Sequence, residues 1–70
     1  MDPVIDTAIL CAERGWKATF TLTNGEVIKT VFITGTDWEQ KFVSVERVGE
    51  RHLSPRLIDL REVKQIEPHW

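Results

Sequence analysis

The sequence predicts a mainly β fold, a small five-stranded antiparallel barrel preceded by one α-helix. Three observations support this prediction. The stretch KATFTLTNGEVIKTVFI, residues 17–33, alternates apolar and polar side chains on both sides of Asn24-Gly25, which is typical of a β-hairpin. Further short apolar stretches, separated by turn signals, follow it as far as Pro68. The chain has 70 residues, which is enough for one domain with one small core.

Residues 3–14 are expected to form the helix. Asp2 suits an N-cap and Pro3 suits the first helical position, although Asp6 offers an alternative start. Gly15 suits the position just beyond the last turn. Between these ends, apolar residues recur at helical spacing: Val4, Ile5, Ile9 and Leu10. A helix this short needs a surface to pack on.

The five strands are expected at about 16–23, 26–34, 41–48, 51–60 and 64–67. In the first strand Ala18, Phe20 and Leu22 point to one side, and lysine and threonine side chains point to the other, wet side. Asn24 and Gly25 both tolerate the positive φ of a type I′ turn, which predicts that kind of turn between the first two strands.

The second strand is apolar on both faces for part of its length, which fits a strongly bent sheet. Residues 35–37 are predicted to be a loop, residues 61–63 a single tight turn, and Pro68 the end of the last strand. Closure into a barrel removes most of the exposed strand edges, and an edge that stays open can pair with another subunit.

The composition is ordinary for a soluble globular protein, with 41% hydrophobic and 29% charged residues. We expect a cytoplasmic protein with no membrane contact, because we find neither a membrane-spanning run nor a signal peptide. The net charge of −2 does not favour tight binding of a bare phosphate backbone, but a local RNA site is compatible with it. Cys11 is the single cysteine, so it has no internal disulfide partner, and we expect it to be buried in the core.

The sequence lacks a convincing catalytic constellation, so we expect neither an enzyme nor a cofactor. His52 and His69 have no cysteine or acidic cluster at ligand spacing, and we interpret them as surface or partly packed residues and expect no metal site. Ser44 and Ser54 lack a nucleophile elbow, and there is no glycine-rich phosphate loop.

The order and spacing of the segments resemble the layout of Sm-like proteins. A helix is followed by KATFTLTNGEVIKTVFITGTD, then KFVSVE, then LIDLREVKQIEP. Within that group, Leu10-Cys11-Ala12 and the segments FTLTNGE, VERVGERHL and RLIDL are similar to the Rof family of bacterial Rho-binding inhibitors of transcription termination. The resemblance covers about residues 5–68. It implies a small five-stranded Sm-like or SH3-like barrel whose last two strands are joined by a short 3₁₀ turn.

The resemblance also implies a non-enzymatic regulator that masks the RNA-binding surface of Rho with its helix and adjoining loops. The candidate partner-binding residues are Asp2, Asp6, Glu13 and Trp38. The acidic residues are either helix-capping and solubilising groups or an electrostatic footprint for a basic partner. Trp38 lies in a polar loop, where it is interpreted either as a contact with a partner or as a locally packed residue.

Two other hypotheses stay open. One is an Sm-like RNA-binding module, with a ring formed by pairing of the fourth and fifth strands between subunits, in which Asp37, Trp38 and Arg61 line the RNA site. The other is an interaction domain with an unrelated partner, for instance one carried by a phage or mobile element, because a fold does not determine a function. The sequence leaves the oligomeric state open. Trp16 is expected to seal the helix against the barrel.

Overall fold

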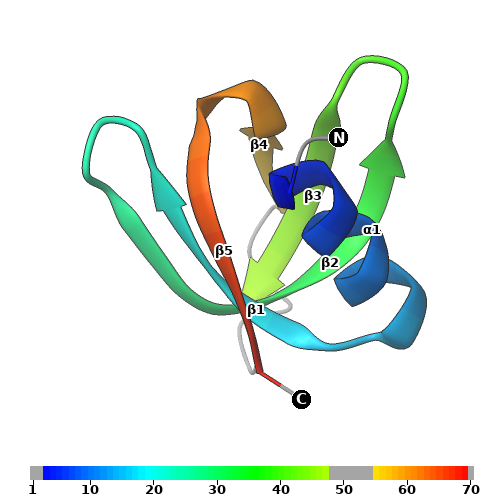
Figure 1. Ribbon diagram of the computed structural model, residues 1–70. Coiled ribbons are helices and arrows are strands. Elements are labelled where there is room, and N and C mark those ends of the chain that lie inside the picture. The colour runs from blue at the N-terminus through cyan, green and yellow to red at the C-terminus, as the bar shows by residue number, and fades with distance from the viewer. Residues whose placement is uncertain (1–2, 48–54, 70) are drawn as a thin grey trace.

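The computed structural model describes residues 3–47 and 55–69 (Figure 1). The elements are α1 (Pro3–Arg14), β1 (Lys17–Leu22), β2 (Val27–Asp37), β3 (Phe42–Arg47), β4 (Arg56–Asp59), the 3₁₀ helix η1 (Leu60–Glu62) and β5 (Val63–His69). The predicted helix at 3–14 and the mainly β character are therefore confirmed. Of the predicted strands, Val48 and residues 51–54 lie outside the described residues.

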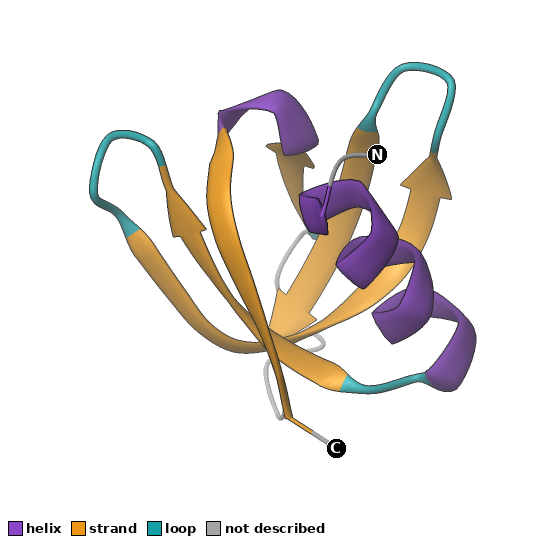
Figure 2. Ribbon diagram, viewed as in Figure 1, coloured by secondary structure: helices purple, strands orange, loops and turns teal. Residues whose placement is uncertain are grey.

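The five described strands form one antiparallel sheet in the order β4-β3-β2-β1-β5. Within the described ranges, β4 and β5 are the two edges of this sheet and are not paired with each other. The β1–β2 turn and the β2–β3 turn are at opposite ends of β2, but the bend of this strand brings both to the side of the molecule where η1 lies (Figure 2). Three connections between strands are therefore gathered on one side of the molecule.

β2 is long and sharply bent (Figure 1). Its first half pairs with β1 and its second half with β3, and a register shift interrupts each ladder. The first shift contains Thr30, which has a positive φ of 54°, a costly conformation for a β-branched residue. The Thr30 N–H donates to Oγ1 of Thr19 at 3.3 Å, which gives this irregular backbone a hydrogen-bond partner. Because bulges increase twist, the two shifts curl the sheet around its inner face.

The core fills the inside of the curled sheet. Phe20, Val31 and Val43 are its largest fully buried side chains, together with Cys11. The burial of Cys11 confirms the sequence prediction, and desolvation raises the pKa of its thiol. Each large apolar side chain that is removed from water in this way contributes about 1.5–3 kcal/mol.

α1 packs against β5 and β2 and buries Ala8 and Cys11. The helix ends as predicted, because Gly15 has a φ of +68° and allows the Trp16 N–H to donate to the carbonyl oxygen of Cys11 at 3.1 Å. Trp16 is half-buried and packs against the core, as expected of a residue that seals the helix.

The prediction of a loop at residues 35–37 is wrong, because these residues continue β2 and pair with β3. Gly35 lies opposite Ser44, and a Cβ at Gly35 would stand only 2.6 Å from the Ser44 Oγ. The glycine therefore allows a close strand approach and does not end the strand. The turn falls at residues 38–41, where Asp37 Oδ1 accepts the Gln40 N–H at 3.0 Å.

The hairpin at Asn24-Gly25 is confirmed, but the type I′ turn is wrong. Gly25 has a φ of +92°, whereas Asn24 is not among the residues with positive φ. The loop holds three residues, since the Leu22 N–H donates to the Glu26 carbonyl and the Gly25 N–H donates to the Leu22 carbonyl. Asn24 supports this loop through its side chain, whose Oδ1 accepts the Glu26 N–H at 2.9 Å.

Two predictions at the C-terminal end need correction. The tight turn is η1, Leu60–Glu62, so Val63 already belongs to β5. Pro68 does not end β5 but pairs with Ala18 inside it. β5 is an edge strand, so a proline without an N–H costs no ladder bond on the open side.

Candidate functional site

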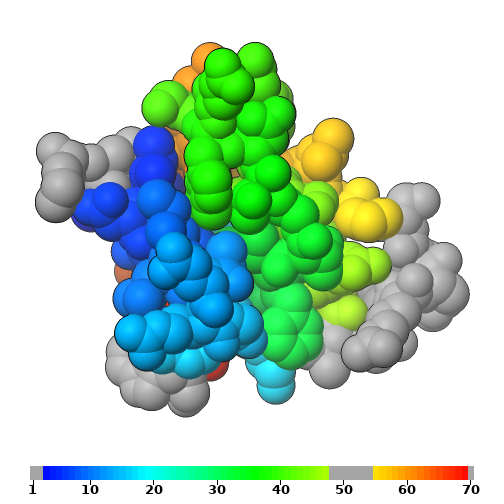
Figure 3. Space-filling view, turned by 90° about the vertical axis from the view of Figure 1, so that its right-hand side faces the viewer, coloured from blue at the N-terminus to red at the C-terminus, as the bar shows by residue number. Residues whose placement is uncertain are grey.

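A groove of about 320 Å³ lies between α1 and the second half of β2, and it reaches the β2–β3 turn. Figure 3 shows α1 and β2 side by side on this face of the molecule. We call it the α1–β2 groove, and its lining residues are Ile9, Ala12, Glu13, Ile33, Thr34, Gly35, Thr36 and Trp38.

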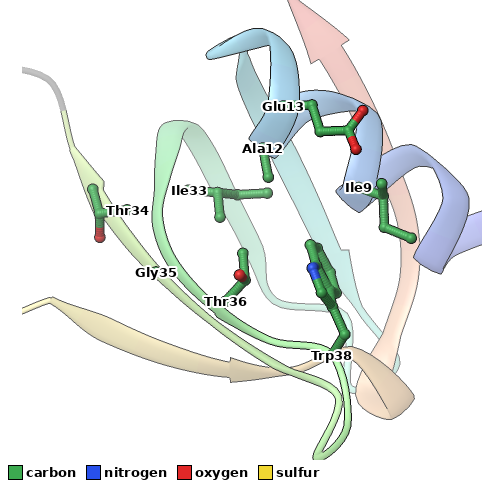
Figure 4. Close-up of a pocket in the computed structure, with 8 residues that line it drawn as sticks. All are labelled: Ile9, Ala12, Glu13, Ile33, Thr34, Gly35, Thr36 and Trp38. Carbon is green, nitrogen blue, oxygen red and sulfur yellow. The ribbon is translucent and has the colours of Figure 1, made fainter.

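The walls of the groove combine apolar and polar groups, and the apolar ones come from three parts of the chain. Ile9 and Ala12 come from α1, Ile33 comes from β2, and the Trp38 ring extends from the β2–β3 turn toward the helix (Figure 4). Trp38 keeps 37% of its surface exposed, which is high for a large aromatic residue. No acceptor within residues 3–47 and 55–69 takes the N–H of its indole, so this donor is available to a ligand.

The local fold explains why Trp38 reaches the groove. Asp37 ends β2 and fixes the following turn through its carboxylate, which accepts the Gln40 N–H. Trp38 is the first residue of that turn, directly after the part of β2 that runs beside α1. The indole thus projects from the end of β2 toward the helix (Figure 4).

The charge at the groove is negative. Glu13 is exposed in the last turn of α1, and Asp6 lies seven residues earlier on the same side of the helix, about 10 Å away along its axis. In the part of the chain that the structure describes, neither carboxylate has an ion-pair partner. The neighbouring cations point to aromatic rings, since Arg14 lies over Trp16 and Lys17 lies over Phe32, each 5.7 Å from the ring centre.

The structure brings two of the predicted partner-binding residues together, because Glu13 and Trp38 both line the α1–β2 groove. Asp6 stands on the same helix but does not line the groove. Asp2 lies outside the described residues, as do His52, Ser54 and Trp70.

The predicted RNA-binding residues are placed differently. Asp37 pairs with Phe42, which pairs with Asp59, so Asp37 lies at the same sheet end as η1. Arg61 in η1 donates from Nε and Nη2 to the Asp59 carboxylate at 3.0 and 2.9 Å. These bonds lower the pKa of Asp59 and raise that of Arg61. Asp37, Trp38 and Arg61 therefore lie at the same end of the sheet, but only Trp38 lines the α1–β2 groove.

Sequence reasoning missed most of the groove lining. Ile9, Ala12 and Ile33 show the apolar periodicity of core residues, and that pattern does not separate a core wall from a groove wall. It also missed a second concavity of about 440 Å³, lined by Val27, Lys29, Thr30 and Arg47. Arg47 reaches it because β3 pairs Arg47 with Val31, a register that a single strand pattern does not reveal.

Within residues 3–47 and 55–69, there is no group of three or more histidine, cysteine, aspartate or glutamate side chains placed to hold a metal ion. The same ranges contain no helix that is both long and apolar enough to span a membrane.

The fold and the groove define a small antiparallel β domain with an acidic, tryptophan-bearing groove beside its helix. Comparison with protein-family models, curated proteins and solved structures finds no match to this chain.

Proposed function

We propose that the protein is a non-enzymatic, cytoplasmic binding protein, a Rof-like regulator that binds a protein of the transcription or RNA machinery, such as Rho, and inhibits termination. The observation that supports this most directly is the convergence of Glu13 and Trp38 on one groove, although they come from different elements. Asp6 extends the negative charge along the same helix. The surface that we propose to contact the partner is therefore the α1–β2 groove together with the exposed side of α1.

The chemistry of this surface suits a basic protein partner. A half-exposed tryptophan beside apolar walls offers the kind of contact in which binding energy concentrates at interfaces. Unpaired carboxylates attract a basic surface over a distance, which raises the association rate and makes it sensitive to salt. A partner with a basic RNA-binding surface would meet both features.

We assign the curled sheet to the Sm-like barrel class as part of this proposal. Three features support the assignment: α1 precedes the strands, β1 lies between β2 and β5, and η1 joins β4 to β5 as a single 3₁₀ turn. The last of these is the short 3₁₀ connection that the family resemblance implies.

A pull-down with purified Rho at low and at moderate salt tests the proposal, together with a termination assay. We expect the native protein to bind Rho at low salt and to reduce termination, and we expect Asp6→Asn, Glu13→Gln and Trp38→Leu to weaken both effects. Glu67→Gln is the matched control, because it removes one exposed carboxylate on β5 that does not line the groove. Absence of binding at low salt would remove Rho as the partner.

A second candidate is an Sm-like RNA-binding module that forms a ring. The observation that favours it is the open edge of β4, where Leu57 is 70% exposed, opposite the open edge of β5. Edges of this kind can pair between subunits. Light scattering and a measurement of oligouridylate binding test it. A ring whose affinity for oligouridylate falls in Asp37→Asn, Trp38→Leu and Arg61→Ala supports the module. A monomer that does not bind oligouridylate excludes it.

A further inference from the structure

We propose that the α1–β2 groove binds an arginine side chain of a partner protein, with the guanidinium held between the Trp38 ring and the Glu13 carboxylate. The inference rests on the proposed function, because it names the partner chemistry that the same groove selects. It concerns one side chain and one pocket, so it can be tested without the whole partner.

The walls of the groove suit the stem of an arginine. Ile9, Ala12 and Ile33 present methyl and methylene groups to the same space. Long basic side chains place their methylene groups along apolar surface and keep the charged head at the rim. An arginine can therefore cover these walls while its guanidinium stays near the opening.

The opening holds two groups that recognise a guanidinium. Trp38 is directed toward α1 and keeps part of its ring exposed, and a cation over an indole face is attracted by the ring electrons. Glu13 lines the same groove and has no ion-pair partner in the described ranges, so its two oxygens are free to accept parallel N–H bonds. The protein already contains one arginine–tryptophan contact, that of Arg14 over Trp16 at 5.7 Å.

Other occupants fit the groove less well. A lysine has a compact ammonium group, which cannot stack on the ring and bond a carboxylate with two parallel donors at once. An apolar side chain would remove water from Glu13 without giving it a hydrogen bond, which is costly. A nucleic-acid backbone would bring phosphate against the carboxylate. The arginine of a protein segment is therefore the occupant that uses the apolar walls, the Trp38 ring and the Glu13 carboxylate together.

Three short peptides test the inference: acetyl-Gly-Gly-Arg-Gly-Gly-amide and its lysine and citrulline counterparts. Binding is followed by two-dimensional nitrogen–proton NMR, in which each tryptophan gives its own indole signal and Trp38→Phe identifies that of Trp38. We expect the arginine peptide to move the Trp38 signal in a saturable way. The lysine peptide is expected to bind at least about threefold more weakly, and the uncharged citrulline peptide to cause no shift at the same concentration.

Two matched variants distinguish binding in the groove from a general effect of negative charge on the peptide. Glu13→Gln should weaken arginine-peptide binding at least about threefold, whereas Glu39→Gln, which removes an exposed carboxylate outside the groove lining, should change it less than about twofold. Trp38→Leu should abolish the preference for arginine over lysine. Circular dichroism confirms that each variant is folded.

The inference is overturned if the arginine peptide leaves the Trp38 signal unmoved, or if Glu13→Gln and Glu39→Gln weaken binding equally. Its failure can be distinguished from failure of the proposed function. Peptide binding at Trp38 without any binding of Rho would retain the arginine site and reject Rho. Rho binding that is unaffected by Glu13→Gln and Trp38→Leu, without a peptide shift, would retain Rho and reject the arginine site.

Discussion

Glu26 and Arg56, 30 positions apart in the sequence, form a two-point ion pair: Nη1 donates to Oε2 at 2.6 Å and Nη2 donates to Oε1 at 2.8 Å. Glu26 directly precedes β2, beside the β1–β2 turn, and Arg56 begins the edge strand β4. β4 pairs through its backbone with β3. The ion pair therefore joins the residue just before β2 to β4, although β3 lies between these two strands in the sheet. Side chains thus connect two parts of the curled sheet that share no backbone ladder.

This ion pair makes stability depend on pH in the acid range. The hydrogen bond from Arg56 lowers the pKa of Glu26, so the folded pKa lies below the ordinary glutamate value. The stabilisation is therefore fully present above the ordinary value and is lost as the pH falls through the lowered pKa. We expect Glu26→Gln to unfold at lower urea concentration than the native protein near neutral pH, and the difference to fade as the pH falls below the ordinary glutamate pKa of about 4.3. A difference that stays constant over this range would show that the carboxylate charge is not its source.

The same pair should be sensitive to salt, because both side chains are about half exposed. Added salt is expected to reduce the difference between native protein and Glu26→Gln near neutral pH. Glu39→Gln is the control, since Glu39 has no ion pair in the described part of the chain and its removal should cause little change.

A second prediction concerns the close approach of Gly35 and Ser44. Gly35→Ala places a methyl group 2.6 Å from the Ser44 Oγ, so this hydroxyl must move and give up its contact with the Thr34 hydroxyl at 3.2 Å. Because the Ser44 hydroxyl is the end of a flexible side chain, the main cost is this lost contact, and we expect Gly35→Ala to lower the unfolding free energy by about 0.5–1 kcal/mol. In Gly35→Ala/Ser44→Ala the clash is relieved, so the double variant should be more stable than the sum of the single effects by about 0.5 kcal/mol or more. Strictly additive urea-unfolding energies would contradict this explanation.

A third prediction compares the stability contributions of side chains on the buried and exposed faces of the sheet. Phe20 is fully buried, and Phe20→Ala is expected to cost about 3–5 kcal/mol, which is a large part of the roughly 4–10 kcal/mol that a domain of this size has. Val27 is apolar but 47% exposed, and Val27→Ala should change the unfolding free energy by less than about 0.5 kcal/mol. If Phe20→Ala does not fold, Phe20→Leu gives the comparison with a smaller loss. If Phe20→Ala and Val27→Ala lower the unfolding free energy equally, the assignment of the core to the face that carries Phe20 is wrong.

A fourth prediction concerns the three-residue hairpin loop. Gly25 has a φ of +92°, which an alanine adopts only with strain, so Gly25→Ala should cost about 1–2 kcal/mol. Asn24 has no positive φ, and a glycine in its place relieves no strain. Asn24→Gly should therefore destabilise the protein, because it removes the side-chain acceptor for the Glu26 N–H. A stabilising effect of Asn24→Gly in thermal unfolding would instead indicate a type I′ turn.

The sequence alone predicted the features that depend on neighbouring residues. The helix at 3–14 follows from its apolar spacing and from Pro3 and Gly15 at its ends. The hairpin follows from strict alternation around Asn24-Gly25, and the burial of Cys11 follows from its residue type. The errors at Gly35 and Pro68 share one cause: each residue breaks a local pattern, but its place in the sheet accommodates it, opposite Ser44 in one case and on the edge strand β5 in the other.

Only the tertiary structure determined which residues from different elements become neighbours. The sequence named Glu13 and Trp38 as separate candidates, but only the packing of α1 beside β2 places them in one groove with Ile9 and Ile33. It likewise brings Glu26 to Arg56. The physical reason is that hydrophobic periodicity specifies which side of an element is buried, whereas the position of one element on another depends on bulges, strand register and side-chain volumes that act across the whole chain.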